Sequence, residues 1–278
     1  MKKTCFLPFM IRKTLYIVLL LFTITSCRKG GLKKVASLPL SLKEASAAEM
    51  IPGSSLIWTI EDSRNRNVLY GVNEHGTLIK EIEISNAKNI DWEDLTSDTY
   101  GNIYIGDFGN NKKERDHFTI YKVTDPMAIE HSTMADVITF KLPPNFKPMN
   151  FEAFFIYQHH FYIINKANKE TKMFKVPNTI GNHTAEFVCS FDLDCEDTKI
   201  TSAAISQDNK TIVLLNKSML WKITEFHSDN FCEATIENRS FNHFSQKEGI
   251  CFKDNHTIYV TDERVWFIGG NIYRIEID

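Results

Sequence analysis

The chain has 278 residues, 43% hydrophobic and 24% charged, which is the balance of an ordinary globular protein and not of a disordered one. Its net charge of −3 comes without a basic stripe, which argues against a nucleic-acid partner. The 20 Phe and 9 Tyr, together with recurring Gly, Asn and Asp turns, favour an all-β fold.

Residues 1–26 have the pattern of a targeting segment. A positively charged stretch precedes an apolar run, 15–22, that is too short to span a membrane as a mature helix. The following Ile24-Thr25-Ser26-Cys27 resembles a bacterial lipobox, which implies cleavage before Cys27 and lipidation of that cysteine. We therefore expect a lipoprotein signal peptide in 1–26 and a lipidated linker in 27–34. A plain signal peptide or an anchor helix is the alternative.

This N-terminus predicts a protein of the bacterial cell envelope that is anchored to a membrane through lipid and faces the periplasm. Such a compartment allows disulfides. Four cysteines remain after the linker, and the sequence does not resolve their three possible pairings; buried free thiols are an equal alternative. They are Cys189, Cys195, Cys232 and Cys251.

A unit of two short strand-like runs joined by a polar turn recurs five times along the chain. In the clearest copy the first run carries Glu93, and the second run ends fourteen residues later at Asp107. Each copy has a Ser or Glu at the position of Glu93. These anchor residues are Ser46, Glu93, Glu152, Ser202 and Glu248.

Two further runs follow in most units. Third runs are predicted at 69–72, 120–123, 173–176, 220–223 and 272–275, and fourth runs at 79–84, 137–142, 186–193 and 234–238. The last unit lacks a fourth run, which the segment 35–40 ahead of the first unit can supply. The pattern predicts one domain, 35–278, folded as a five-bladed β-propeller whose last blade is closed by an N-terminal strand. A six-bladed propeller with one degenerate blade is the alternative.

The first strand of each propeller blade lines the central channel, so the five anchor residues are expected to point into it. Three carboxylates in a narrow ring repel each other and must either take up protons or bind a cation. Carboxylate and hydroxyl oxygens in such a ring suit Ca²⁺, whereas no His/Cys cluster has zinc spacing. The alternative is that these glutamates only cap neighbouring strand ends.

A second set of polar residues lies at or beside the ends of the second runs, where we expect them to surround one mouth of the channel. A role as turn-forming residues is equally compatible with several of them. They are Asp62, Arg64, Asp107, Asn110, Lys166, Asn216, Asp262 and Glu263.

These motifs resemble two propeller families. The order Ser, Glu, Glu, Ser, Glu is similar to that of the calcium-activated nucleotidase (apyrase) family, a five-bladed propeller whose channel holds calcium, and Asp62 in Glu61-Asp62-Ser63-Arg64 looks like its catalytic Asp. Glu248-Gly249-Ile250 and the run 259–264 resemble the SdiA-regulated family. The nucleotidase pattern is met only in part, because the basic residues that handle phosphate have a match in Lys166 or Arg64 at best.

The sequence favours a lipid-anchored propeller with a channel Ca²⁺ that binds a small-molecule or protein ligand or acts as a scaffold. The alternative is a Ca²⁺-dependent phosphohydrolase in which Asp62 or Asp107 positions the attacking water. A glycosidase with paired carboxylates is a third hypothesis, for which no pair can be singled out.

The lipobox makes a direct prediction. A clickable palmitate analogue fed to the producing bacterium should label the wild-type protein and leave Cys27→Ser unlabelled, with the variant lost from the membrane fraction. A Cys27→Ser protein that remains labelled and membrane-bound would show that Cys27 is not the lipid attachment site.

Overall fold

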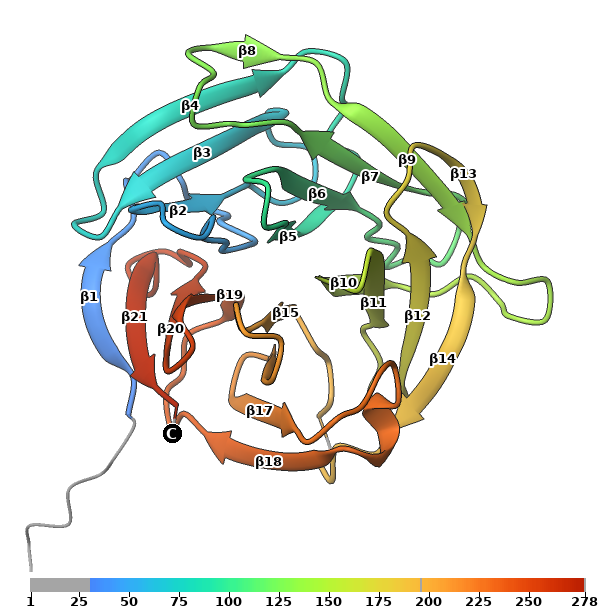
Figure 1. The fold of residues 1–278 in the computed structure, drawn as a ribbon. Coiled ribbons are helices and arrows are strands. Elements are labelled where there is room, and N and C mark those ends of the chain that lie inside the picture. Colours follow the sequence, from blue (N-terminus) through green and yellow to red (C-terminus); the bar gives the residue numbers. More distant parts are fainter. Residues whose placement is uncertain (1–30, 196, 278) are drawn as a thin grey trace, which may run out of the picture. The chain divides into compact units, whose positions relative to one another are not determined.

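Five β-sheets surround a central axis in the part of the chain from Leu32 to Asp278 (Figure 1). In this computed structural model the described residues are 31–195 and 197–277, so the predicted signal peptide and Cys27 lie outside them. The sheets follow one another in chain order, and each is one blade. The prediction of an all-β five-bladed propeller is therefore confirmed, and the six-bladed alternative is wrong. No helix among the described residues is long and apolar enough to cross a membrane.

The strands of each blade run outward from the axis in sequence order, except that β1 is the outermost strand of blade 5, and their bounds agree with the repeat. Blade 1 contains β2 (Leu56–Thr59), β3 (Val68–Asn73), β4 (Leu78–Ile84) and β8 (Ser132–Thr133). Blade 2 contains β5 (Trp92–Ser97), β6 (Ile103–Asp107), β7 (Phe118–Val123), β9 (Asp136–Lys141) and β13 (Gly181–Thr184). Blade 3 contains β10 (Phe151–Tyr157), β11 (His160–Asn165), β12 (Thr171–Pro177) and β14 (Glu186–Phe191).

Blades 4 and 5 complete the ring. Blade 4 contains β15 (Ser202–Ile205), β16 (Ile212–Leu215), β17 (Met219–Thr224) and β18 (Thr235–Ser240), with the 3-10 helix η1 (Phe231–Glu233) ahead of β18. Blade 5 contains β19 (Lys247–Asp254), β20 (Thr257–Asp262), β21 (Asn271–Glu276) and β1 (Lys33–Ser37). Because β1 pairs antiparallel with β21, the N-terminal strand supplies the missing fourth strand, as predicted.

The innermost strand of blade 1 is irregular. The segment 45–49 reaches β2 and the residues after it only through isolated bridges, Ala45 to Glu61 and Glu49 to Trp58. Between those bridges the Thr59 hydroxyl donates to the Ala47 carbonyl over 2.7 Å, which satisfies a backbone acceptor that the broken ladder leaves. The irregular segment lies in the unit whose interval is longer, since Ser46 and Asp62 are sixteen positions apart and Glu93 and Asp107 are fourteen.

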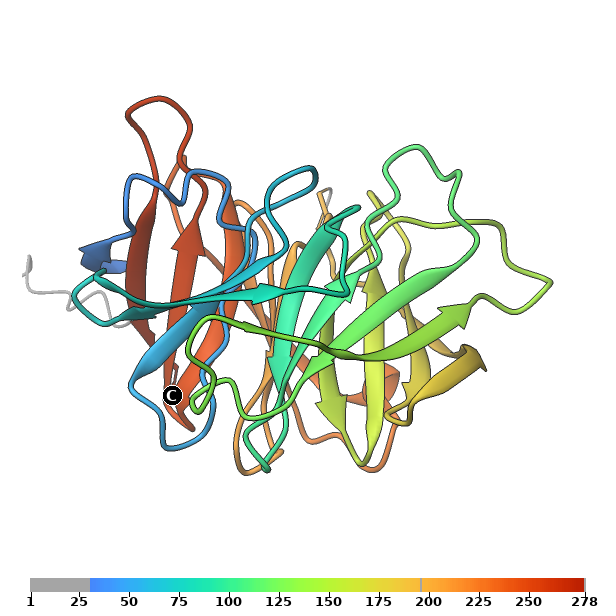
Figure 2. The same cartoon turned by 90° about the horizontal axis from the view of Figure 1, so that it is seen from above.

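Two short outer strands were not predicted from the sequence. Strand β8, which precedes β9 in the chain, pairs in parallel with β4 of blade 1, and β13, which precedes β14, pairs in parallel with β9 of blade 2. Each therefore extends the blade before its own and covers an outer edge that would otherwise be free to pair with another chain. Figure 2 shows the sheets in a second view.

Hydrophobic side chains fill the space between every two neighbouring blades. Five buried clusters of this kind close the ring, and both faces of each blade are covered. Most of the cluster between blades 2 and 3 is aromatic, with Phe118, Phe151 and Phe174 packed edge to face. Polar side chains are therefore left to the outer strands, to the axis and to its two ends.

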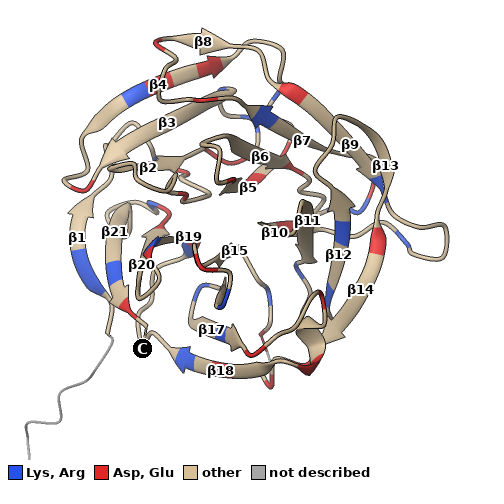
Figure 3. Ribbon diagram, in the orientation of Figure 1, with Lys and Arg blue, Asp and Glu red and all other residues tan. Residues whose placement is uncertain are grey.

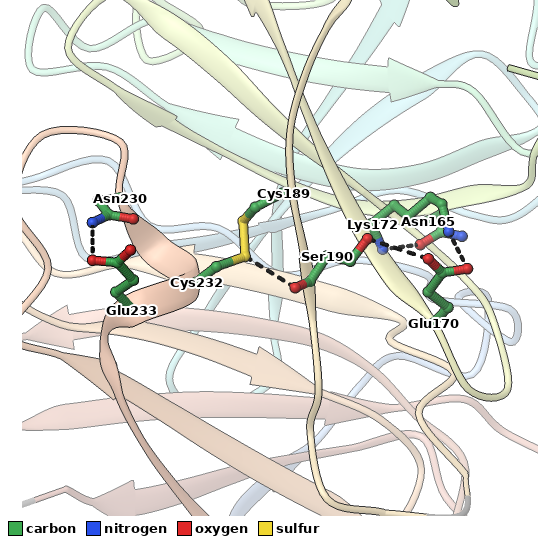
Figure 4. Close-up of a disulfide and its surroundings, with 8 residues drawn as sticks. All are labelled: Asn165, Glu170, Lys172, Cys189, Ser190, Asn230, Cys232 and Glu233. Atoms are coloured by element: carbon green, nitrogen blue, oxygen red, sulfur yellow. Dashed lines mark hydrogen bonds and ion pairs between the residues drawn. A yellow bond between two sulfur atoms is a disulfide. The ribbon is translucent and has the colours of Figure 1, made fainter. Parts of the chain in front are cut away.

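One disulfide joins blade 3 to blade 4. Cys189 on β14 bonds to Cys232 in η1, and Cys195 and Cys251 are free thiols (Figure 4). The sequence had left this pairing open because partners 43 residues apart come together only through the contact between two blades.

Candidate metal site at the channel mouth

Three glutamates that the repeat aligned are each the extra residue of a β-bulge. On β5, Trp92 pairs with Asp107 and Asp94 with Gly106, so Glu93 has no partner across the ladder. The same shift surrounds Glu152 on β10 and Glu248 on β19. A bulge breaks the alternation of side chains and re-aims the extra residue. The bulges therefore turn all three carboxylates out of the blade interfaces and toward the axis.

These carboxylates meet in a cavity of about 70 Å³ at the end of the axis where the inner strands begin. Four of the five anchor residues line it, and so do three residues of the predicted mouth. They are Ser46, Glu93, Glu152, Glu248, Asp62, Lys166 and Glu263. Figure 3 shows acidic positions on β5 and β10, in the inner part of the ring. The cavity is small. For comparison, one water molecule in the liquid occupies about 30 Å³.

Three carboxylates lie close together in this region. They belong to Asp62, Asp91 and Glu93. Each can place a carboxylate oxygen within 4.8 Å of the others, which is compatible with shared binding of one metal ion. Gly109 makes this approach possible, because a Cβ atom there would overlap both Glu93 and Asp91. At such separations and an effective dielectric of about 20, each charged pair repels by roughly 3 kcal/mol.

The protonation equilibria reflect this crowding. Burial, followed by the charges of Glu152, Asp62 and Asp91, raises the pKa of Glu93 well above its ordinary value. Burial also raises the pKa of Glu248 to about 8. Without a cation, the buried carboxylates at this mouth are therefore driven to hold protons near neutral pH.

Lys166 is the cation that the chain itself places in the cavity. Its ammonium group forms an ion pair with Glu152, whose other oxygen accepts a hydrogen bond from the Asn150 side-chain amide over 2.7 Å. Burial opposes the charge on Lys166, but the neighbouring Glu152 outweighs it, and the pKa of Lys166 is raised. Glu152 is thus partly neutralised, whereas Glu93 has no such partner among the described side chains.

Ser202, the fifth anchor residue, lies below the cavity and not in its lining. Its hydroxyl donates to Asp94 Oδ1 over 2.8 Å and accepts a hydrogen bond from the Ile250 N–H over 3.1 Å. Asp94 Oδ2 also accepts the N–H groups of Phe154 and Ala203 over 3.2 Å each. Through these bonds the Asp94 carboxylate of blade 2 contacts the inner strands of blades 3 and 4 directly. It is connected to the inner strand of blade 5 through Ser202. Together these residues form a hydrogen-bonded layer between the inner strands, here called the floor, which lines neither this cavity nor the one at the other end of the strands.

Most of the remaining mouth residues have structural partners. The Asp107 side chain is fully buried, bonds to Arg115 over 2.9 Å and accepts the Asp91 N–H. Asp262 accepts the Asn271 N–H and the Tyr273 hydroxyl. Asn110 and Asn216 each accept backbone N–H groups of the loops that follow them. Arg64 is exposed beside a separate surface depression. Of these positions, Asn110 and Asn216 have the bonds of turn-forming residues.

Sequence reasoning did not assign Asp91, Asp94 or Gly109. The spacing of Asp91 and Glu93, two residues apart at a strand entry, is a signal that points to a shared face. Nothing local marks Asp94, because strict alternation would send it to the same side as Trp92 and only the bulge separates them. The role of Gly109 follows from an approach across a turn that spacing does not reveal.

Comparison with known proteins supports the fold and no more. No protein-family model and no curated protein matches the chain. Among solved structures, the PQQ-bound aldose sugar dehydrogenase of Streptomyces coelicolor superposes with a TM-score of 0.53 at 10% identity, over 90% of this chain and 99% of that one. A chain of the nidogen/laminin complex gives a TM-score of 0.48 at 8% identity, over 83% of this chain and 84% of that one. A score this low does not support a conclusion about this chain. The resemblances to the nucleotidase and SdiA-regulated families therefore gain no support beyond the motifs themselves.

The floor yields a stability prediction. Asp94→Asn keeps the shape but replaces one acceptor oxygen by an amide NH₂, so at least one of the three donors is left facing another donor. We expect the free energy of unfolding, measured with urea, to fall by about 1–3 kcal/mol. Ser202→Ala removes one of those donors together with the acceptor for Ile250 and should cost less. An Asp94→Asn protein as stable as wild type would show that the floor does not depend on this carboxylate.

Proposed function

We propose that this protein is a lipid-anchored propeller of the bacterial cell envelope that holds Ca²⁺ at one mouth of its channel and serves there as a binding or scaffold protein. The observation that carries the metal site is the convergence of Asp62, Asp91 and Glu93 to within 4.8 Å. Their oxygens are hard ligands, and the adjustable 6–8-fold coordination of Ca²⁺ tolerates an irregular set better than the octahedron of Mg²⁺.

The size and charge of the cavity also support an ion. About 70 Å³ accommodates a cation with one or two waters but not an organic molecule. A divalent cation offsets the repulsion that raises the pKa of Glu93, and Glu152, Glu248 and the Ser46 hydroxyl lie around the same cavity to complete the oxygen set. An external ligand would therefore contact the ion from outside the channel.

Exposed apolar side chains flank this mouth and support a role in partner binding. Trp266 is 87% and Phe267 97% exposed at the tip of the loop that follows Glu263, and Phe244 is fully exposed two residues before Gln246 of the cavity wall. Large exposed apolar side chains near a polar site are compatible with partner binding. The Cys189–Cys232 disulfide supports an oxidising compartment such as the periplasm.

The alternative, a Ca²⁺-dependent phosphohydrolase, is favoured by one feature. Lys166 and the exposed Asp62 line the same cavity, so a phosphate at the mouth would meet a cation and a candidate for positioning water. Asp107, the other catalytic candidate, is buried against Arg115 and does not reach the cavity. The scaffold function is preferred because the remaining groups of the mouth are mainly carboxylates, which repel phosphate.

The calcium site predicts a metal-dependent stability. At a hundredfold excess over its Kd, an ion that binds only the folded state adds about 2.7 kcal/mol to the free energy of unfolding. Ca²⁺ should therefore raise the melting temperature of EDTA-treated protein, and Glu93→Gln should lose most of that response. Asp62→Asn, at an exposed position, should lose it in part without risk to folding. Glu237→Gln, on the exposed strand β18, is the matched control and should respond as wild type.

The response should also depend on pH. Because the pKa of Glu248 is about 8 in the folded state against an ordinary 4.5, the folded protein binds the extra proton in this window. Stability of the metal-free protein should therefore fall as pH rises from about 4.5 to about 8. Ca²⁺ competes with these protons, so its stabilising effect should be larger near pH 8 than near pH 5. A melting temperature indifferent to Ca²⁺ and EDTA at both pH values would rule out the calcium site.

Phosphate release separates the two candidate functions. With a nucleoside diphosphate as substrate, a malachite-green assay should show no Ca²⁺-dependent release above background if the protein only binds. Release that requires Ca²⁺ and is lost in Asp62→Asn would establish the hydrolase instead.

A further inference from the structure

A second and larger cavity lies at the opposite end of the channel. The inner strands begin at the carboxylate mouth and end here, so β5 leads from Glu93 at one end to Ser97 at the other. The cavity measures about 440 Å³, within the range of small-molecule sites, and all five blades contribute to its wall, from Glu49 in the first to Phe252 in the fifth. It is separate from the proposed calcium site, because the two cavities share no lining residue.

The carboxylates that line this cavity are not balanced by Lys or Arg side chains. Two carboxylates, Glu49 and Asp98, line it, and no Lys or Arg does. The Asp98 carboxylate is already saturated, since one oxygen accepts the N–H groups of Tyr100 and Asn102 and the other accepts the Tyr104 hydroxyl and the Asn102 amide. Glu49, by contrast, has one side-chain partner in the described part of the chain, the Ser97 hydroxyl at 2.6 Å. Glu49 is therefore the group left to meet a ligand.

The rest of the wall is mixed, and its apolar part is suited to an organic body. Met50, Ile156 and Phe252 are apolar, and Tyr100 and Tyr157 add aromatic rings. Aromatic faces attract cations, and one carboxylate among such side chains is too few oxygens for a metal ion. An anionic ligand would find no Lys or Arg side chain in this wall.

We propose that this cavity binds a small organic cation, an amine with an aliphatic or aromatic body, whose ammonium group pairs with the Glu49 carboxylate. The ammonium restores to that carboxylate the stabilisation that it loses by leaving water, while the apolar walls bury the body of the ligand. The carboxylate ring at the other mouth takes no part.

Proton release should accompany binding. Burial raises the pKa of Glu49 to about 8, against the opposing hydrogen bond from Ser97, so near neutral pH the free protein carries a proton there that an ammonium displaces into the buffer. The other titratable groups in the wall are Asp98, whose oxygens are saturated as described, His159, Tyr100 and Tyr157. The buried Cys251 thiol, whose pKa is raised well above its ordinary value by burial and by the charge of Glu49, stays protonated.

The test uses isothermal titration calorimetry near pH 7 with benzylamine and n-butylamine, against the neutral benzyl alcohol and n-butanol of the same shape and the anionic benzoate. We expect at least one amine to bind tenfold or more tightly than its alcohol, with release of nearly one proton, measured in two buffers of different ionisation enthalpy. Glu49→Gln should lose the tenfold preference and the proton release, and Glu237→Gln should keep both.

Each other outcome overturns the proposal. Equal binding of amine and alcohol would indicate a neutral-ligand site, tighter binding of benzoate would indicate an anion site, and no binding of either amine would exclude an amine site. If Glu49→Gln does not fold, the amine-to-alcohol ratio and the proton count of the wild-type protein decide alone.

Discussion

The buried carboxylate of Asp94 is the interaction on which the centre of this propeller depends. Blades packed only through hydrophobic clusters would leave the N–H groups of their inner strands unsatisfied along the axis. Asp94 accepts such groups from blades 3 and 4, and Ser202 passes the connection on to blade 5. Burial raises the pKa of Asp94 well above its ordinary value, and the donors from Ser202, Phe154 and Ala203 oppose that shift. The channel is thus closed in its middle by hydrogen bonds and not by apolar packing.

This floor determines what the mouth above it can do. Glu93 is the residue before Asp94, so the bulge that aims one carboxylate down into the floor aims the other up into the cavity. The hydrogen-bond donors of the floor are already bound to Asp94. The carboxylates that converge above the floor therefore find no free donor in it. Lys166 relieves Glu152, and the group of Asp62, Asp91 and Glu93 is left with excess negative charge. A divalent cation is the simplest way in which a protein can keep such a group ionised.

The same floor separates two ends with different chemistry. One end has a small cavity whose wall is mainly oxygen, and the other has a wide cavity with a mixed polar and apolar wall and one available carboxyl group. Both ends are built from the same five inner strands, whose first residues face one mouth and whose last residues face the other. A propeller can therefore carry two independent sites without any insertion into its blades.

The repeat of strand-like runs was enough to predict the blades, their number, the closing N-terminal strand and the inward position of Glu93, Glu152 and Glu248, because each of these follows from local alternation and from a period that the chain repeats. Tertiary structure alone decided the rest. The bulges send Asp94 into the floor, Ser202 follows it there, Arg115 takes Asp107 away from the mouth, and Cys189 finds Cys232 on the next blade. These outcomes depend on how closely strands of different blades approach at the axis or at their edges. That distance is set by the packing of all five blades together, and no local pattern of residues records it.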